Sequence, residues 1–250
     1  MEKRNRIISG YSFSMKSPDT ISEQITKNGF AIIDNVFTPE EIDSILLIIS
    51  TANSTKPTFR RTNDLFAIRQ FFKELPRIRE LVFTKKLNLL IVDLFGTDYS
   101  IVKSLYFDKP PKSNWFVAWH QDLTISVDKK VDTEGFSLWT VKQDQFAVQP
   151  PANILENNFT IRIHLDDTDE NNGALKVIPS SHLKGIHKPA TIEKEVTCKV
   201  KKGGVMIMRP LLFHASNKTT NNQKRRVIHI EFSNSTLPIP LQWSEQMSLE

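Results

Sequence analysis

The segment Phe159–Leu165, FTIRIHL, decides how the fold of this chain is interpreted. It alternates apolar and polar residues, and neighbouring side chains of a strand point to opposite faces. One face is therefore apolar, with Ile161, Ile163 and Leu165, and the other is polar, with Thr160, Arg162 and His164. Such a strand fits a sheet whose polar face meets solvent. It fits equally a sheet that packs on helices and turns its polar face toward a cavity.

The segment Arg226–Phe232, RVIHIEF, shows the same alternation. Its apolar face holds Ile228, Ile230 and Phe232, and His229 and Glu231 lie opposite. Arg225 falls on the side of His229 because the strand period is two. Arg226 falls on the apolar side, and we expect its guanidinium to reach solvent past the sheet. Two such strands fit a polar cavity, while the surface alternative stays open at this point.

The residues before position 99 are predicted to be mainly helical. Thr38 precedes Pro39, and Glu41 follows it by three positions, which is the pattern of a capping box at a helix start. Gly96 ends the last helical pattern. The expected helices cover Ser22–Lys27, the segment after the Thr38 cap through Ile49, Asp64–Phe72 and Ile78–Phe95, and one strand covers Phe30–Val36.

From Ser100 onward the pattern changes to strands and turns. The candidate strands are Ile101–Phe107, Trp115–Leu123, Phe159–Leu165, Ala174–Pro179, Val205–Met208 and Arg226–Phe232. Helices followed by separated strands indicate an α+β, mainly β, domain built around a barrel or sandwich. We expect one domain over residues 1–250, with residues 1–98 as mainly helical support and residues 99–235 as the barrel. Residues 124–158 lack clear periodicity, which is typical of a lid-like insert or binding loop.

Composition and charge exclude several classes of protein. The only cysteine among the 250 residues is Cys198, so no intramolecular disulfide can form. The first ten residues lack the apolar run of a signal peptide, and the longest apolar run, Ile45–Ile49, is too short for a membrane span. A cytoplasmic location is therefore expected, with no membrane partner. The net charge is +5, but the basic residues are scattered, so no nucleic-acid partner is expected and an anionic small-molecule substrate explains the charge.

His120-Gln121-Asp122 is a His-x-Asp motif on a predicted strand. Residues two positions apart point to the same face, so the imidazole and the carboxylate can reach one ion. His214, which follows the Gly203-Gly204 turn and the strand Val205–Met208, offers a third ligand. Two histidines and one carboxylate leave positions open for substrate and oxygen, as in non-heme iron(II) oxygenases. His-x-Asp alone is a weak signal, and its order among other motifs strengthens it.

These motifs run along nearly the whole chain. They are Asn28-Gly29-Phe30 with Thr38–Ile42, Trp119–Asp122, the block from Asn172-Gly173 to His182, and His214 with Ser216 and Arg225. The set resembles the phytanoyl-CoA dioxygenase family of iron(II)- and 2-oxoglutarate-dependent oxygenases, and the block ending in His182 is its most specific part. The resemblance implies a double-stranded β-helix, a jelly-roll or cupin-like barrel, with N-terminal helices packed on one sheet.

The resemblance also implies roles for individual residues. The implied ligands of iron(II) are His120, Asp122 and His214, with 2-oxoglutarate and oxygen as co-substrates. Arg225 matches the basic residue that pairs with the far carboxylate of 2-oxoglutarate, for which a planar guanidinium is well suited. Ser216 matches a hydroxyl that holds the same carboxylate. Lys103 falls where the family often places another polar co-substrate contact, and an exposed strand lysine is the alternative. Because Asp122 is present, hydroxylation is favoured over halogenation.

Other polar residues have less specific interpretations. Arg162, predicted to face a cavity, fits either an anion-binding residue for co-substrate or substrate, or a buried ion pair. His182 is interpreted as structural, and His187 and His229 receive no functional role. The substrate is a small organic molecule whose identity the sequence does not indicate. Its contacts are expected in residues 124–158, where the candidates are Phe136, Trp139, Lys142, Gln145 and Phe146.

Two other functions stay open at this stage. One is a non-enzymatic, cupin-like protein that binds a metal or ligand, although the complete ligand set with Arg225 argues against it. The other is a nucleic-acid demethylase of the AlkB type, whose closing motif of two arginines around Asn and Asp is not found in Lys224–Val227.

Overall fold

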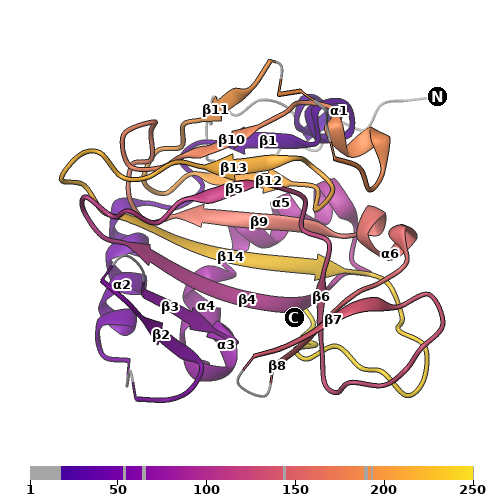
Figure 1. Cartoon of the computed structure of the whole chain (residues 1–250). Coiled ribbons are helices and arrows are strands. Elements are labelled where there is room, and N and C mark those ends of the chain that lie inside the picture. The colour runs from indigo at the N-terminus through magenta and orange to yellow at the C-terminus, as the bar shows by residue number, and fades with distance from the viewer. Residues whose placement is uncertain are drawn as a thin grey trace, which may run out of the picture.

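The computed structural model shows a strand-rich molecule with helices along one side (Figure 1). It describes residues 18–52, 55–63, 66–142, 145–188, 191–192 and 194–249. The helices are α1 (Pro18–Asn28), α2 (Pro39–Ser50), α3 (Phe71–Glu74), α4 (Ile78–Val82), α5 (Lys85–Phe95), α6 (Ala152–Asn157) and a 3-10 helix η1 (Ser181–Lys184). Among these residues, no helix combines the length and apolar character that crossing a bilayer requires.

Within the described part of the chain, the strands form three antiparallel sheets. The large sheet has the order β1-β12-β9-β14-β4-β3-β2, the second sheet β11-β10-β13-β5, and a small third sheet β6-β8-β7. The strands of the large sheet are β1 (Phe30–Ile33), β12 (Val205–Met208), β9 (Phe159–His164), β14 (Arg225–Ser233), β4 (Ser100–Lys109), β3 (Phe66–Arg69) and β2 (Phe59–Arg61). Those of the second sheet are β11 (Val196–Cys198), β10 (Leu175–Val177), β13 (His214–Ser216) and β5 (Val117–His120). Those of the third are β6 (Ile125–Val127), β8 (Gln145–Gln149) and β7 (Ser137–Lys142).

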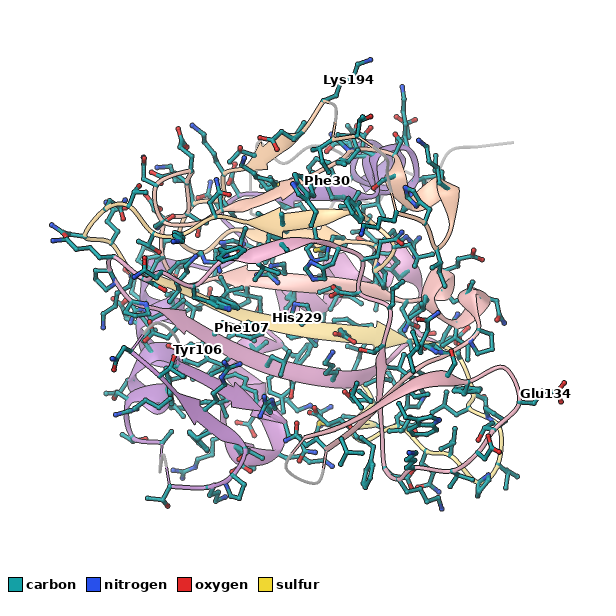
Figure 2. The ribbon with its side chains drawn as sticks, viewed as in Figure 1. Phe30, Tyr106, Phe107, Glu134, Lys194 and His229 are labelled. Carbon is teal, nitrogen blue, oxygen red and sulfur yellow. The ribbon has the colours of Figure 1, made fainter. Side chains whose placement is uncertain are left out.

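The two faces of β9 and β14 resolve the alternative that the sequence left open. The apolar face packs on the helices, because residues of both strands share one buried core with residues of α2, α4 and α5; among them are Ile161, Ile228, Ile42, Ile78 and Leu87. The polar face turns toward the second sheet. In β4, Tyr106 stacks on Phe71 of α3 at 5.7 Å, whereas Phe107 lies on the inner face with its ring 6.2 Å from that of His229 (Figure 2). The predicted jelly-roll barrel with helices packed on one sheet is confirmed.

The N-terminal segment follows the prediction in part. The capping box of α2 is confirmed, since the Glu41 amide donates to Thr38 Oγ1 at 3.2 Å and Glu41 Oε2 accepts from the Thr38 amide at 2.8 Å. The predicted single helix over Ile78–Phe95 is two helices, because Thr84 caps α5 by accepting from the Leu87 amide. Three strands of the large sheet, β1, β2 and β3, also come from residues 1–98.

The helix predicted over Asp64–Phe72 is wrong. Asp64 lies outside the described residues, Phe66–Arg69 is strand β3, and only Phe71–Glu74 is helical. Strand β3 pairs with β4 so that Ile68 lies opposite Tyr106. A short apolar segment follows its partners in space rather than its own propensity, and here the partner is the edge of the large sheet.

The insert over residues 124–158, which shows no clear periodicity in the sequence, is a folded sheet with one helix; its role as a lid or binding segment stays a prediction. It contains β6, β7, β8 and α6. The pattern was hidden because the pairing of β7 with β8 is irregular between Ser137 and Thr140, and Leu138 has a positive φ of 51°. An irregular residue shifts the alternation by one position, so the strand shows no regular period.

Arg226 also differs from the prediction. Its guanidinium does not extend freely into solvent; it is half-buried and forms a two-pronged contact with Asp166, with Nε–Oδ2 at 2.8 Å and Nη2–Oδ1 at 2.6 Å. The Arg226 amide donates to the same carboxylate at 2.9 Å. Asp166 directly follows the last residue of the FTIRIHL segment, so this pair ties the end of β9 to the start of β14.

Replacing Gly203 should destabilise the molecule more than replacing another glycine of similar backbone conformation. Gly203 has a φ of +81°, and an added Cβ would overlap the carbonyl oxygen of Phe37, whereas Gly96 has a φ of +84° and open space around it. Gly96→Ala carries only conformational strain, about 1–3 kcal/mol. Gly203→Ala adds overlap with a backbone atom, so we expect it to lose roughly 2 kcal/mol more. Urea unfolding of both variants measures the difference, and equal losses would contradict it.

Candidate active site

The two candidate metal-binding histidines are brought together by pairing of β5 with β13. His120 lies opposite His214 in this register, and their ring centroids are 4.3 Å apart. Asp122 was expected on the same strand as His120, but β5 ends at His120. Asp122 instead lies in the following loop, where its amide donates to the Pro210 carbonyl at 2.9 Å. That bond turns the carboxylate back toward the two imidazoles.

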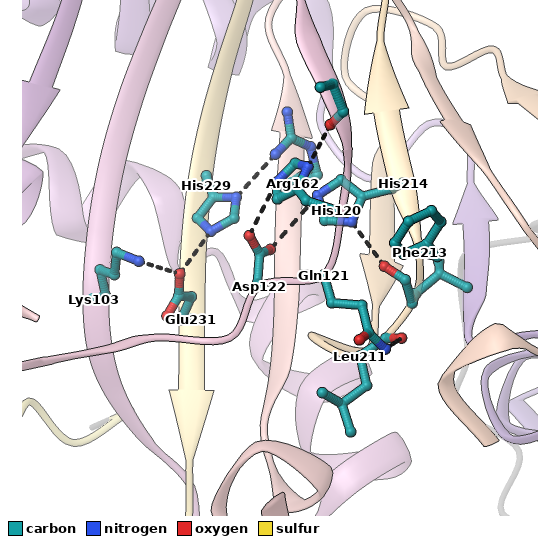
Figure 3. A network of polar contacts seen from close by, with 12 residues as sticks. Lys103, His120, Gln121, Asp122, Arg162, Leu211, Phe213, His214, His229 and Glu231 are labelled. Atoms are coloured by element: carbon teal, nitrogen blue, oxygen red, sulfur yellow. Dashed lines mark hydrogen bonds and ion pairs between the residues drawn. The ribbon is translucent and has the colours of Figure 1, made fainter. Parts of the chain in front are cut away.

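The three side chains could hold one metal ion. His120 Nε2 lies 3.6 Å from Asp122 Oδ1, and His214 Nε2 lies 3.8 Å from Asp122 Oδ2 (Figure 3). The three candidate ligand atoms all lie within 4.8 Å of one another. In both imidazoles Nδ1–H donates to a backbone oxygen at 2.8 Å, that of Ala118 for His120 and that of Leu212 for His214. These bonds fix the tautomer and leave each Nε2 free for a metal.

The electrostatics of the three residues suit a cation. Burial lowers the pKa of His214 to about 4, although the Asp122 charge opposes this shift. Burial also opposes ionisation of Asp122, but His214 and His120 outweigh it and hold the pKa of this carboxyl far below its usual value. A neutral imidazole and an ionised carboxylate are the forms that bind a metal. For His120, burial is outweighed by the bond to Asp122, which raises its pKa.

Gln121, between the two candidate ligands, has a role that the sequence reasoning missed. Its side chain is buried on the opposite side, where Nε2 donates to the carbonyls of Leu211 at 2.6 Å and Gly185 at 2.8 Å. Its Oε1 accepts from the His187 amide at 3.0 Å. The alternation that places His120 and Asp122 on one side could have indicated this, because the residue between them must point away. His187 thus supports the site through its backbone.

Four side chains on the inner face of the large sheet form a chain of polar contacts (Figure 3). Arg162 Nη1 donates to His229 Nδ1 at 2.9 Å, and His229 Nε2 donates to Glu231 Oε1 at 3.1 Å. Lys103 Nζ donates to the same Glu231 oxygen at 2.7 Å. Lys103 is therefore paired within the cavity wall rather than extended from an exposed strand. Arg162 contacts a histidine rather than a carboxylate, and His229, which was given no role, joins the two ends.

Arg225 and Ser216 lie in the same cavity as the three candidate ligands. The cavity has a volume of about 220 Å³, and besides these five residues its lining includes Lys103, Arg162, Trp115, His229 and Glu231. Arg225 and Ser216 are buried, and within the described part of the chain Arg225 Nε and Ser216 Oγ have no hydrogen-bond partner. Buried polar atoms normally have partners, so these two indicate room for a ligand with oxygen acceptors.

The cavity end near Arg225 collects positive charge. Lys109 lies opposite Arg225 in the β14–β4 register, is fully buried, donates to the Asn217 carbonyl, and lies 5.5 Å from the ring centroid of Trp115. Burial, and after it the Arg225 charge, lower the pKa of Lys109 to about 7. Burial and the charge of Arg162 lower the pKa of Arg225 to about 9. Buried cations of one sign are unfavourable together, and an anion among them relieves that repulsion.

The remaining sequence candidates lie outside this cavity. His182 is not a candidate metal ligand. Its Nε2 lies 3.1 Å from the Thr26 carbonyl oxygen, and this contact joins η1 to α1. In the insert, Gln145 and Phe146 line a neighbouring cavity, whereas Phe136 and Trp139 pack into a separate apolar cluster. The Lys142 side chain lies outside the described residues.

Comparison with known proteins identifies the family. Residues 25–227 match the phytanoyl-CoA dioxygenase (PhyH) family. The chain belongs to this family. Family membership together with the His-Asp-His site makes it a non-heme iron- and 2-oxoglutarate-dependent enzyme, and neither the cupin-like binding protein nor the AlkB-type demethylase gains support. No protein with a curated description matches the chain.

Several solved structures share the fold. EvdMO1 superposes with a TM-score of 0.63 at 22% identity over 88% of this chain, which spans 50% of that protein. AviO1 from Streptomyces viridochromogenes Tue57 gives a TM-score of 0.62 at 20% identity, covering 89% of this chain and 97% of its own. HygX from Streptomyces hygroscopicus, with nickel and 2-oxoglutarate bound, gives 0.60 at 14% identity, covering 84% and 86%. At sequence identities this low, the structural similarity shows that the fold is shared and shows nothing more.

Removal of the buried Lys109 charge should change how stability depends on pH. Because its pKa is about 7 in the folded chain and ordinarily 10.5, the unfolded chain binds more protons between these values, and the free energy of unfolding rises with pH. Lys109→Met should lack this contribution. The free energy of unfolding of the wild type, relative to that of the variant, should therefore rise by up to about 1.4 kcal/mol per pH unit in this window. Denaturant unfolding at pH 7, 8.5 and 10 measures it. The exposed Lys130→Met is the matched control, and parallel curves for wild type and Lys109→Met would contradict the expectation.

Proposed function

We propose that His120, Asp122 and His214 bind iron(II) and that Arg225 with Ser216 holds the far carboxylate of 2-oxoglutarate, so that the enzyme hydroxylates a small organic substrate. The observation that supports this most is the presence, in one cavity, of three convergent metal-ligand atoms and two buried polar atoms without partners. Iron(II) with 2-oxoglutarate supplies the oxygen activation that amino-acid side chains lack.

The donor set fits iron(II) chemically. Two imidazoles and one carboxylate suit this ion and leave positions for a co-substrate and oxygen. The Nδ1 bonds of His120 and His214 to backbone carbonyls hold both rings in the orientation needed for ligation. Gln121 holds the intervening backbone through three hydrogen bonds, so Asp122 does not rotate away with its loop.

The co-substrate end fits a dicarboxylate. The Arg225 guanidinium can bond a carboxylate with two parallel N–H groups, and the Ser216 hydroxyl can donate a further bond. Arg162 adds positive charge around it, and Lys109 does so in its protonated form, below its pKa of about 7. The chain Arg162–His229–Glu231–Lys103 holds Arg162 in place, and the Glu231 carboxylate is engaged at one end, so it does not compete for Arg225.

The proposal extends to the charge of the substrate and to the cellular location of the protein. We infer that the substrate is anionic, which the net charge of +5 and the basic cavity support. A cytoplasmic location is supported by the single, buried Cys198, since a reducing compartment suits a chain that forms no disulfide.

Loss of the first candidate ligand should abolish iron-dependent turnover. His120→Ala should lower iron(II) affinity and succinate formation from 2-oxoglutarate by more than ~100-fold, because loss of a direct ligand exceeds the 10–100-fold effect of an outer partner. His182→Ala, which removes a histidine outside the cavity, should keep both. Iron titration under nitrogen and succinate assay after admission of air measure the two effects. Equal iron affinity in wild type and His120→Ala would refute the ligand assignment.

Loss of the Arg225 charge should weaken binding of 2-oxoglutarate and leave binding of the metal unchanged. Arg225→Met should raise the 2-oxoglutarate concentration for half-maximal turnover by ~10–100-fold, the effect of losing a charged hydrogen-bonded contact. Arg226→Met is the matched control, since the neighbouring arginine contacts Asp166 on the other face. Turnover measured against 2-oxoglutarate concentration in both variants gives this requirement. An unchanged requirement in Arg225→Met, or an equal rise in Arg226→Met, would place the co-substrate elsewhere.

A further inference from the structure

Arg162 has hydrogen-bonding capacity that its protein contacts do not use. It is buried in β9, the strand between β12 and β14, and it lines the metal cavity. A guanidinium has five N–H groups. Within the described part of the chain, Arg162 Nη1 donates to His229 Nδ1 at 2.9 Å and Nε has no partner. Buried donors are normally satisfied, so the unpaired Nε indicates an acceptor that binds in the cavity.

The contact with His229 fixes the orientation of this guanidinium. An arginine N–H can only donate, so His229 Nδ1 is the acceptor and the ring carries its proton on Nε2. That proton is donated to Glu231 Oε1 at 3.1 Å, and Lys103 Nζ donates to the same oxygen at 2.7 Å. Burial lowers the pKa of His229, which agrees with a neutral ring. Among the described residues, the Glu231 carboxylate therefore reaches Arg162 only through the imidazole.

Arg162 and Arg225 enter the cavity at different places. Arg162 lies opposite His229 in the β9–β14 pairing, and Arg225 lies four residues before His229 on β14. Four residues of a strand span roughly 13 Å, so the backbones of the two arginines are separated by about this length along the sheet. Figure 3 shows the Arg162 guanidinium between His229 and His214. Burial lowers the pKa of Arg162 to about 10, and the charge of the nearby Asp122 opposes this shift. Arg162 is therefore the cationic group beside the metal ligands, and Arg225 is the one farther along β14.

Two cationic groups match the two carboxylates of 2-oxoglutarate. The proposed function pairs the far carboxylate with Arg225 and Ser216, and it leaves the carboxylate beside the keto group without a protein donor. A carboxylate has two oxygens, so one that binds a metal ion can still accept hydrogen bonds at the other. The alternative is a substrate group at Arg162. The cavity of about 220 Å³ has to hold the metal and the co-substrate, which leaves little room for such a group.

We propose that Arg162 binds the carboxylate that adjoins the keto group of 2-oxoglutarate, and that His229 is the positioning residue that holds Arg162 for this contact. The inference rests on the proposed function, because it takes the metal cavity as the co-substrate site. It divides recognition of the co-substrate between two arginines. Arg225 recognises the far carboxylate, and Arg162 keeps the reacting end in one orientation.

The test compares two ligands that share the keto-acid end. 2-Oxoglutarate has both carboxylates, whereas 2-oxopentanoate has a methyl group in place of the far one. The full-length protein, loaded anaerobically with iron(II), is titrated with each ligand by calorimetry. Arg162→Gln should weaken both ligands by the same factor, about 10-fold or more, because both lose a charged hydrogen bond. Arg225→Met should weaken 2-oxoglutarate and leave 2-oxopentanoate unchanged, because only the former has the far carboxylate.

A second variant and a matched control complete the experiment. His229→Phe removes the acceptor of Arg162 and keeps the pair of Glu231 with Lys103, so it should weaken both ligands by equal factors while Arg162 itself is intact. Where Arg162→Gln no longer binds iron(II), His229→Phe alone decides. Arg209→Gln removes a half-buried arginine outside the metal cavity, whose guanidinium lies 5.7 Å from the Phe95 ring centroid, and should change neither affinity.

The outcomes separate this inference from the proposed function. If Arg162→Gln weakens 2-oxoglutarate alone, Arg162 binds the far carboxylate, and if it changes neither ligand, Arg162 does not bind the co-substrate. Either result overturns the inference, as does a wild type that binds 2-oxoglutarate but not 2-oxopentanoate. A wild type with iron(II) that does not bind 2-oxoglutarate, or an Arg225→Met variant that binds it with unchanged affinity, would instead contradict the proposed function.

Discussion

The pairing of β5 with β13 is the contact on which the site depends. It sets His120 opposite His214, two residues far apart in the sequence, and the end of β5 at His120 lets the chain turn so that Asp122 faces both. A shift of one residue in this register would point one imidazole to the opposite face. The buried side chain of Gln121 opposes such a shift, because its amide is bonded to Leu211, Gly185 and His187. Metal-ligand geometry is thus set by backbone register before any ion binds.

A cavity of this kind is unfavourable for stability, and the rest of the fold offsets it. Arg162, Arg225 and Lys109 are buried together, and each loses hydration without a carboxylate in direct contact among the described residues. The opposite face of the same strands compensates, since Ile161, Ile228 and their neighbours share an apolar core with α2, α4 and α5. The two faces of β9 and β14 therefore have opposite effects on stability. One face buries apolar side chains, and the other holds the charges that a dianionic co-substrate would neutralise.

The sequence allowed prediction of what depends on regular alternation. FTIRIHL and RVIHIEF indicated both strands, their faces and the inward position of Arg225, and the Thr38–Glu41 pattern indicated the start of α2. The rest depends on partners in space. Asp122 looked like a strand residue because the sequence does not show where β5 stops pairing, and Phe66–Arg69 looked helical because its partner, β4, lies far along the chain. The contacts of His229 were not predictable either, since they need Arg162 from another strand.

Two segments that the sequence reasoning missed, β3 and the insert sheet, line a second cavity of about 310 Å³ beside the metal cavity. Strand β3 and the insert sheet carry Arg69, Gln145 and Phe146, and neither showed a regular period. There is a physical reason for this coincidence. A residue whose side chain packs in the core must follow the period of its element, whereas a residue that lines a cavity is free of that requirement. The metal-binding end of the site is therefore predictable from its motifs, whereas the second cavity becomes apparent only once strand pairing places β3 beside β4.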